Sequence, residues 1–498
     1  DFFQLWKIKS SIDLRKKEES DNQYDLIINK DRKTLSDFIN KKTKTYRCLD
    51  GQIYRSTKIL QFNKKQFYKD TFLLLKSKKR IVRKAIINFL ITNNFIKDLE
   101  CSKLWPNENL TGKISLKKFI NISPTILSDL YFWMNLKNNN NAILAANIYD
   151  IRKNSLDIPS YLQKAQKTSK PIILQSSFNA IGHKEKKSEG YLKLKNGPDD
   201  FVNNVYNKAR DLYLKNNKDF LFGIGLDHVD FRYNTPKGRV NRFLKKFSNV
   251  NNITHYTLDS SYLLESKKIK NFDLEKKKIV LNVIKNEISL LKQIYDNHIF
   301  DFEFCANELN YIDNEKKVFL PNKQDIQFFA QSFFDLINKS KIQFFNSRPK
   351  LIIGNLGTVH HGKDPKYVKS EVSKEWIDSI KHLNFISAVL HGTSRSNPSI
   401  LKRATAGCFK INVAGDFLQV LVSSLPHKLQ KIVLDKNDNE KRKLYLIRDK
   451  MDSMTHKEQN KIKKALGNKC NKLMKLIQTP SLSSNDISYF KYKNYNLN

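Results

Sequence analysis

Residues that could bind a metal or move a proton stand at the ends of short apolar runs in this chain. Asp227-His228 end the run FLFGIGLDH, His391 ends FISAVLH, and His360-His361 follow LIIGN. Neutral imidazole is a favoured zinc ligand, and a carboxylate beside a bound metal can act as a general acid or base. The residue types therefore predict metal-assisted proton transfer, provided that the fold brings these positions together.

The apolar runs are typical of buried parallel strands. They alternate with longer stretches at helical spacing, as in a (β/α)₈ barrel with insertions. We therefore predict an α/β fold, a (β/α)₈ TIM barrel preceded by a mainly helical N-terminal domain. An open doubly wound sheet is the alternative, but no Gly-x-Gly-x-x-Gly follows any run. The runs cover residues 143–149, 171–177, 220–228, 253–260, 298–304, 351–355, 385–391 and 408–414.

In such barrels the carboxyl ends of the strands build the active site. Three histidines from separate strands, His228, His391 and one of His360 and His361, could hold zinc and leave a position open for substrate. Asp227 adjoins one of these ligands and could move the proton. The other histidines are expected to be structural, and His255 and His298 in particular because they stand near the starts of their strands. Further polar residues on the predicted strands are Glu303, Lys410 and Asn412.

The polar run Asn138–Asn141 is the best domain boundary. We predict a basic, helical N-terminal domain of unassigned role over residues 1–140, the barrel over 141–440, and a C-terminal helical extension and tail over 441–498.

The composition limits which partners and which cellular setting can be expected. The formal net charge is +41, which suits a polyanion, but lysines are scattered through every segment, so a general compositional bias is the better explanation and nucleic acid is not an expected partner. The 5 cysteines form no Cys-x-x-Cys pair, which argues against a zinc finger or a disulfide framework and fits a cytoplasmic setting. No apolar stretch reaches the ~20 residues of a membrane span.

Several motifs resemble those of class II ketose-bisphosphate aldolases, in family order over roughly 300 residues. Gly225-Leu226-Asp227-His228 is similar to the family's His-x-Asp-His. Gly357-Thr358-Val359-His360-His361-Gly362 resembles the Gly-Asn/Thr-x-His-Gly turn, and Leu390-His391-Gly392-Thr393-Ser394 resembles the His-Gly-Gly-Ser turn. Gly407–Val413 is similar to the family's Gly-x-x-Lys-x-Asn-x strand, and Thr257–Ser261 to its Asp-Gly-Ser segment.

The resemblance implies zinc or another divalent metal, and aldol cleavage or condensation of a phosphorylated ketose or related sugar through a metal-stabilised enediolate. It assigns the metal to His228, His391 and His361 or His360, with a slight preference for His361. Asp227 would exchange the hydroxyl proton, Asn412 would contact the enediolate, and Glu303 would be a catalytic or supporting carboxylate. The implied substrate and phosphate contacts are Asn147, Ser176, Ser177, Gly362, Gly392, Ser394, Arg395, Lys410 and Asp416. Family members are often dimers or larger, so a homo-oligomer or a partner subunit is expected.

The chain departs from the family in its phosphate loop. Ala414-Gly415 stand where the family has Asp-Thr, followed by Asp416, and Thr393 replaces the second Gly of His-Gly-Gly-Ser. Arg395 could bind phosphate in compensation, or be a solvated loop residue. Glu303 has Cys305 where the family has a second Glu.

These departures leave alternatives to an active aldolase. One is a non-catalytic barrel that supports a partner enzyme. Gly190-Tyr191 and Gly197–Phe201 resemble the accessory subunit of tagatose-bisphosphate aldolase, which is consistent with it. The other is a nucleic-acid-binding regulator that acts through the basic N-terminal region.

Overall fold

The computed structural model describes the chain in part. The described residues are chiefly 141–152, 154–181, 198–230, 253–259, 301–305, 323–339, 350–355, 386–391, 398–404, 408–434 and 444–493, with short strands at 47–49, 52–54, 98–100, 113–115, 311–312 and 318–319. By contacts the chain divides into two compact units, one of residues 1–122, 296–299 and 488–498, the other of 123–295 and 300–487.

Eight parallel strands of the second unit pair in a closed ring, in chain order. They are β5 (Ile143–Asn147), β6 (Ile172–Ser177), β7 (Phe222–Asp230), β8 (His255–Asp259), β9 (Asp301–Cys305), β12 (Lys350–Asn355), β13 (Ile386–His391) and β14 (Cys408–Val413). The last strand, β14, pairs with β5 and closes the barrel. Each strand falls on one of the apolar runs, so the predicted parallel α/β class is confirmed.

Helices connect the strands where the connections are described. α8 (Asp157–Thr168) lies between β5 and β6, α9 (Phe178–Ile181) and α10 (Pro198–Asn216) between β6 and β7, α14 (Lys323–Lys339) before β12, and α16 (Pro398–Ala404) before β14. A two-stranded pair, β10 (Tyr311–Ile312) and β11 (Val318–Phe319), precedes α14. Much of the chain between β7 and β9 and between β12 and β13 lies outside the described residues. A helix after every strand therefore stays a prediction.

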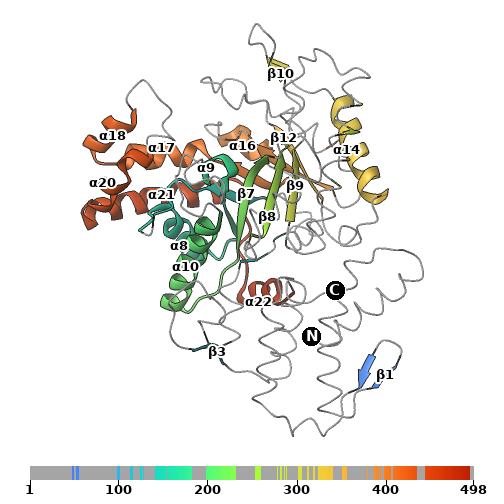
Figure 1. Cartoon of the computed structure of the whole chain (residues 1–498), viewed down its shortest axis with the longest axis horizontal. Helices are drawn as coiled ribbons and strands as arrows, with labels where there is room; N and C mark the ends of the chain where they lie inside the picture. The colour runs from blue at the N-terminus through green and yellow to red at the C-terminus, as the bar shows by residue number, and fades with distance from the viewer. Residues whose placement is uncertain are drawn as a thin grey trace. The chain divides into compact units, whose positions relative to one another are not determined.

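The C-terminal helices belong to the same unit as the barrel. α17 (Gly415–Ser424) follows the last strand, and α18 (His427–Leu434), the 3₁₀ turn η5 (Leu444–Ile447), α20 (Arg448–Asp452) and α21 (His456–Leu476) come after it. α21 begins with a capping box formed by Thr455 and Glu458, and its apolar stripe packs against α8 and α17. Figure 1 shows α8, α10 and α21 together outside the strands.

The core between strands and helices forms because alternate strand residues point outward. On β7, Phe222, Ile224 and Leu226 are fully buried in this core. The residues between them, Gly223 and Gly225, lie on the opposite side of the strand. The strands thus present an apolar outer face to the helices and keep the other face for the barrel interior.

The first unit is described only in its short strands, apart from α22 (Ser484–Lys493), which spans the division between the units. β1 (Arg47–Leu49) pairs with β2 (Gln52–Tyr54), and β3 (Asp98–Glu100) with β4 (Lys113–Ser115), both antiparallel. The predicted helices of residues 1–140 fall largely outside the described residues, and the domain boundaries stay predictions. No helix among the described residues is long and apolar enough to cross a membrane.

Candidate active site

Polar side chains from seven of the eight strands converge inside the barrel. Glu303 of β9, Lys410 and Asn412 of β14, His391 of β13 and Asp227 of β7 are buried, with exposed fractions between 0% and 7%. Strand alternation places Lys410 and Asn412 on the same face of β14, away from the apolar outer core. The ring of strands therefore brings together residues that lie up to 185 positions apart in the sequence (412 − 227).

Glu303 is the central carboxylate of this group. Its Oε1 contacts the Nζ of Lys410 and the Nε2 of His255, and its Oε2 accepts a hydrogen bond from Thr257 at 2.9 Å. Burial alone would raise the pKa of Glu303, but Lys410 and His255 hold that pKa well below its usual range. Glu303 is therefore an anion although it is fully buried.

His391 and Asn412 lie next to that carboxylate. The Nδ2 of Asn412 lies 2.5 Å from the Nε2 of His391, which is 3.8 Å from Glu303 Oε2. Thr393 donates to the backbone oxygen of Asn412 at 2.6 Å and so joins the ends of β13 and β14. Among the described residues, the Oδ1 of Asn412 is buried without a hydrogen-bond partner. This amide oxygen is available to a ligand inside the barrel.

Gln175 joins this group to the other side of the barrel. Its Nε2 donates to Asn147 Oδ1 at 2.7 Å and to Asp227 Oδ2 at 3.2 Å, while its Oε1 accepts from Lys410 at 3.2 Å. Sequence reasoning missed Gln175. The available signal was alternation on β6: if Ser177 faces the interior, so does Gln175.

The same alternation separates the two predicted serines. Because Gln175 points inward, Leu174 and Ser176 point toward the outer core, where Leu174 is fully buried. Ser177, half-buried at the end of β6 and paired in register with Asp227, is then the better candidate for a substrate contact.

A glycine explains one departure from the family motif. Gly225 stands where the motif has His, and a Cβ there would lie 3.0 Å from the Cβ of Gln175. A larger side chain would displace Gln175. One residue further along, the register between β7 and β8 shifts between Leu226 and Val229, across the Asp227-His228 pair.

His255 also belongs to this group, although its position at the start of a strand suggested a structural role. Its ring reaches Glu303 and lies 3.0 Å from the Nζ of Lys410. The side chain of His228, and all of His360, His361, Gly362, Gly392, Ser394 and Arg395, lie outside the described residues. Within the described part of the chain, no group of three or more His, Cys, Asp or Glu side chains is placed to hold a metal.

Asp416 has a partner outside the barrel interior. It lies in the first turn of α17, and its Oδ2 is 2.6 Å from the Nζ of Lys469 on α21. This ion pair ties two outer helices together. The structure thus gives Asp416 a packing role besides the predicted phosphate contact.

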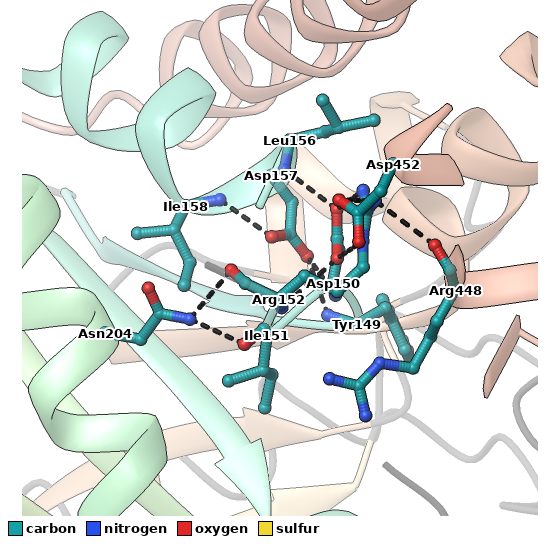
Figure 2. Close-up of polar contacts among 10 residues, drawn as sticks. All are labelled: Tyr149, Asp150, Ile151, Arg152, Leu156, Asp157, Ile158, Asn204, Arg448 and Asp452. Atoms are coloured by element: carbon teal, nitrogen blue, oxygen red, sulfur yellow. Dashed lines mark hydrogen bonds and ion pairs between the residues drawn. The ribbon is translucent and has the colours of Figure 1, made fainter. Parts of the chain in front are cut away.

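The loop after Asn147 is held by a second cluster of buried charges, shown in Figure 2. Arg152 pairs with both oxygens of Asp150, at 2.7 Å each, and reaches Asp452 of α20 at 2.8 Å. Asp157 accepts backbone N–H bonds from Tyr149, Asp150 and Ile158 at 2.7–2.9 Å. The backbone that leaves β5 just beyond the site is therefore fixed to α8 and to the C-terminal helices.

Comparison with known families bears on the C-terminal part of this site. Residues 353–471 match the family model of the class II fructose-bisphosphate aldolases. Over this stretch the chain is similar to class II aldolases. The match includes His391, Lys410 and Asn412, and it confirms the predicted resemblance and the predicted class of enzyme, an aldolase-type lyase.

Solved structures are similar at low identity. The YdjI aldolase of Escherichia coli K12 is 14% identical, over 71% of this chain and 97% of its own, with a TM-score of 0.43. Fructose-bisphosphate aldolase of Campylobacter jejuni is 16% identical, over 72% and 95%, with a TM-score of 0.45. A probable tagatose 6-phosphate kinase of Sinorhizobium meliloti is 12% identical, over 71% and 92%, with a TM-score of 0.46. No curated protein gives a significant sequence match.

Proposed function

We propose that this chain is a metal-dependent aldolase that breaks or forms a carbon–carbon bond in a phosphorylated ketose or a related sugar. The observation that carries the proposal is the buried network from Asp227 through Gln175 and Lys410 to Glu303 and His391, inside a barrel whose C-terminal strands match the class II family. The network joins a proton-transfer carboxylate to an imidazole that is a favoured metal ligand.

The donor set is compatible with a divalent metal. His391 supplies a buried imidazole nitrogen, next to the anionic Glu303 and the amide of Asn412. We propose zinc, held by His391 with His228 and either His361 or His360. When bound, the metal would act as a Lewis acid toward the substrate's carbonyl oxygen.

The chain's own residues would then act on the substrate as follows. Asp227 accepts the proton of the substrate hydroxyl as the adjacent carbon–carbon bond breaks, and the bonding electrons move toward the carbonyl group. Gln175 keeps the Asp227 carboxylate in place through its amide N–H. The Nδ2 of Asn412 has a second N–H besides the one that faces His391. This N–H would donate a hydrogen bond where negative charge develops on oxygen, a position at which a fixed donor stabilises the transition state. Condensation follows the same path in reverse.

The test combines metal content and turnover. We expect purified wild-type chain to contain about one zinc per chain and to release an aldehyde from at least one member of a panel of ketose phosphates. His391→Ala and His228→Ala should lose both properties. His427→Ala, an exposed histidine of α18, is the matched control and should lose neither. Wild-type chain that takes up no metal when zinc is supplied would exclude the proposal.

One observation favours a non-catalytic barrel as the second candidate. Asp416, predicted to assist the altered phosphate loop, is paired with Lys469. If the barrel is non-catalytic, the chain would bind zinc without turnover, and adding the chain to a partner aldolase would raise the partner's activity. The panel assay separates the two candidates, since only the first predicts cleavage by the isolated chain.

A further inference from the structure

A buried cation lies at the centre of the polar network. Lys410 is fully buried on β14, and its ammonium group contacts Oε1 of Glu303 and lies 3.2 Å from Oε1 of Gln175. His255, with 2% of its surface exposed, converges on the same Glu303 oxygen. Removing three ionisable groups from water is costly unless each has a partner, and apolar residues of similar volume usually fill a core equally well. Stability alone therefore does not account for this arrangement.

Lys410 determines the orientation of the amide on one side of the barrel. An ammonium group has three donors and no acceptor, so the Gln175 atom that faces it must be the amide oxygen. The amide nitrogen then points toward Asn147 and Asp227, at 2.7 and 3.2 Å. Without Lys410 the Gln175 amide could rotate and turn its oxygen toward Asp227. The amide oxygen and the Asp227 carboxylate would then repel each other, and Asp227 would lose its donor.

On the other side, Lys410 and His255 hold the carboxylate that faces the metal-binding imidazole. Both bind Oε1 of Glu303, which leaves Oε2 to Thr257 and, at 3.8 Å, to His391. The Nε2 of His255 contacts Glu303, while its Nδ1 is buried and has no hydrogen-bond partner among the residues that the structure describes.

We propose that Lys410 and His255 are positioning residues that link the two halves of the site. They fix Gln175, and through it the proton-transfer group Asp227, and they fix Glu303, and through it His391. This inference rests on the proposed aldolase function. It adds that neither residue contacts the reacting atoms, and that both act by keeping the two halves in a set geometry.

The test is a set of four variants of the full chain and one control variant, compared with wild type. Lys410→Met keeps the length of the side chain and removes its charge. Lys410→Met leaves the Glu303 carboxylate without its ammonium partner. The double variant Lys410→Met/Glu303→Gln removes that unpaired charge and so guards against misfolding. His255→Gln keeps a donor toward Glu303, and His255→Leu does not. Lys431→Met, an exposed lysine of α18, is the matched control.

We expect Lys410→Met to lower zinc affinity, measured by chelator competition, by about 10-fold, as when other supporting groups around a metal are lost. kcat should fall about 100-fold with little change in KM, since the defect is in the geometry of catalytic groups. The double variant should regain its melting temperature but not kcat. His255→Gln should keep kcat within about threefold of wild type, and His255→Leu should not.

Two results would overturn the inference. In the first, the double variant regains kcat together with stability, which means that Lys410 only neutralises Glu303. In the second, Lys410→Met and His255→Leu both keep wild-type zinc affinity and kcat. In either case wild-type chain binds zinc and the proposed function stands. Failure of the proposed function is a different outcome, in which wild-type chain itself binds no zinc.

Discussion

The barrel interior and the loop after β5 each bury a cluster of charges, but they do so in different ways. In the interior, the charged residues come from strands far apart in sequence, and each carboxylate oxygen of Glu303 has its own partners. In the loop, Asp150, Arg152 and Asp157 lie within eight positions of one another (150 to 157). Arg152 binds the carboxylate of Asp150 and that of the distant Asp452, while Asp157 binds backbone N–H groups.

The two clusters therefore shift their carboxylates in opposite directions. Lys410 and His255 outweigh burial and lower the pKa of Glu303. In the loop, burial and the neighbouring Asp150 raise the pKa of Asp157 to about 7, in spite of three backbone N–H donors. The negative charge of Asp157 need not be fully balanced, because the loop cluster serves to hold the backbone. In the proposed function Glu303 must stay an anion, so its charge has to be balanced by Lys410 and His255. This difference distinguishes a structural use of buried charge from a functional one.

The largest effect is expected from Asp227→Asn in the interior. Loss of the general base should lower kcat by about 10²–10⁴-fold, because the amide cannot accept the hydroxyl proton. The melting temperature and the zinc content should stay close to those of wild type. A variant that keeps more than a tenth of the wild-type kcat would mean that another group takes the proton.

Arg152→Met in the loop should act on stability instead. Removing one partner of a buried ion pair leaves an uncompensated charge on Asp150, and the free energy of unfolding should fall by about 3–5 kcal/mol, measured with denaturant. Below its transition, the variant should retain the wild-type zinc stoichiometry. Asp452→Asn removes only the exposed partner of Arg152 and should cost about 1 kcal/mol or less. Equal losses for the two variants would contradict the assigned roles.

How much of this contrast could be foreseen from sequence depends on the range of the interactions. The eight strands were predictable because each is a continuous apolar run bounded by polar residues, and Asp227, Glu303, His391 and Asn412 were predictable from their places on those strands. The inward position of Gln175 follows from the same alternation, but it becomes decisive only when its neighbours across the barrel are known.

The parts that could not be predicted depend on contacts between distant segments. His255 starts its strand, which suggested the wrong end of the barrel, yet its side chain reaches Glu303 on the next strand. The pairing of Arg152 with Asp452 spans 300 positions, and no local pattern indicates it. The Asp416–Lys469 pair likewise depends on how α21 packs against α17.

A third effect concerns pH. The pKa of Asp157 is about 7 in the folded chain against 3.8 for a free side chain, so between these values the folded state binds more protons than the unfolded state. The stability from this group is fully present below about pH 4 and is lost as pH rises through 7, by at most about 4 kcal/mol. Asp157→Asn should remove this slope. Other carboxylates, Glu303 among them, contribute slopes of the opposite sign, so the difference between the wild-type and variant unfolding curves is the quantity to measure. A difference that does not change with pH would show that Asp157 is ionised throughout.

The smallest effect is expected at Lys469 and Asp416. These two residues test whether a charged pair serves packing alone or also binds substrate. Lys469 is partly exposed, so Lys469→Met should lower the free energy of unfolding by about 1 kcal/mol or less. If Asp416 only ties α17 to α21, Asp416→Asn should match Lys469→Met in stability, and both should leave KM for the phosphorylated substrate unchanged. If Asp416 also contacts the substrate, KM should change in Asp416→Asn alone. Steady-state kinetics on the two variants side by side therefore distinguish a helix-packing ion pair from a residue of the phosphate loop, because the loss of the ion pair is common to both and only the substrate contact differs.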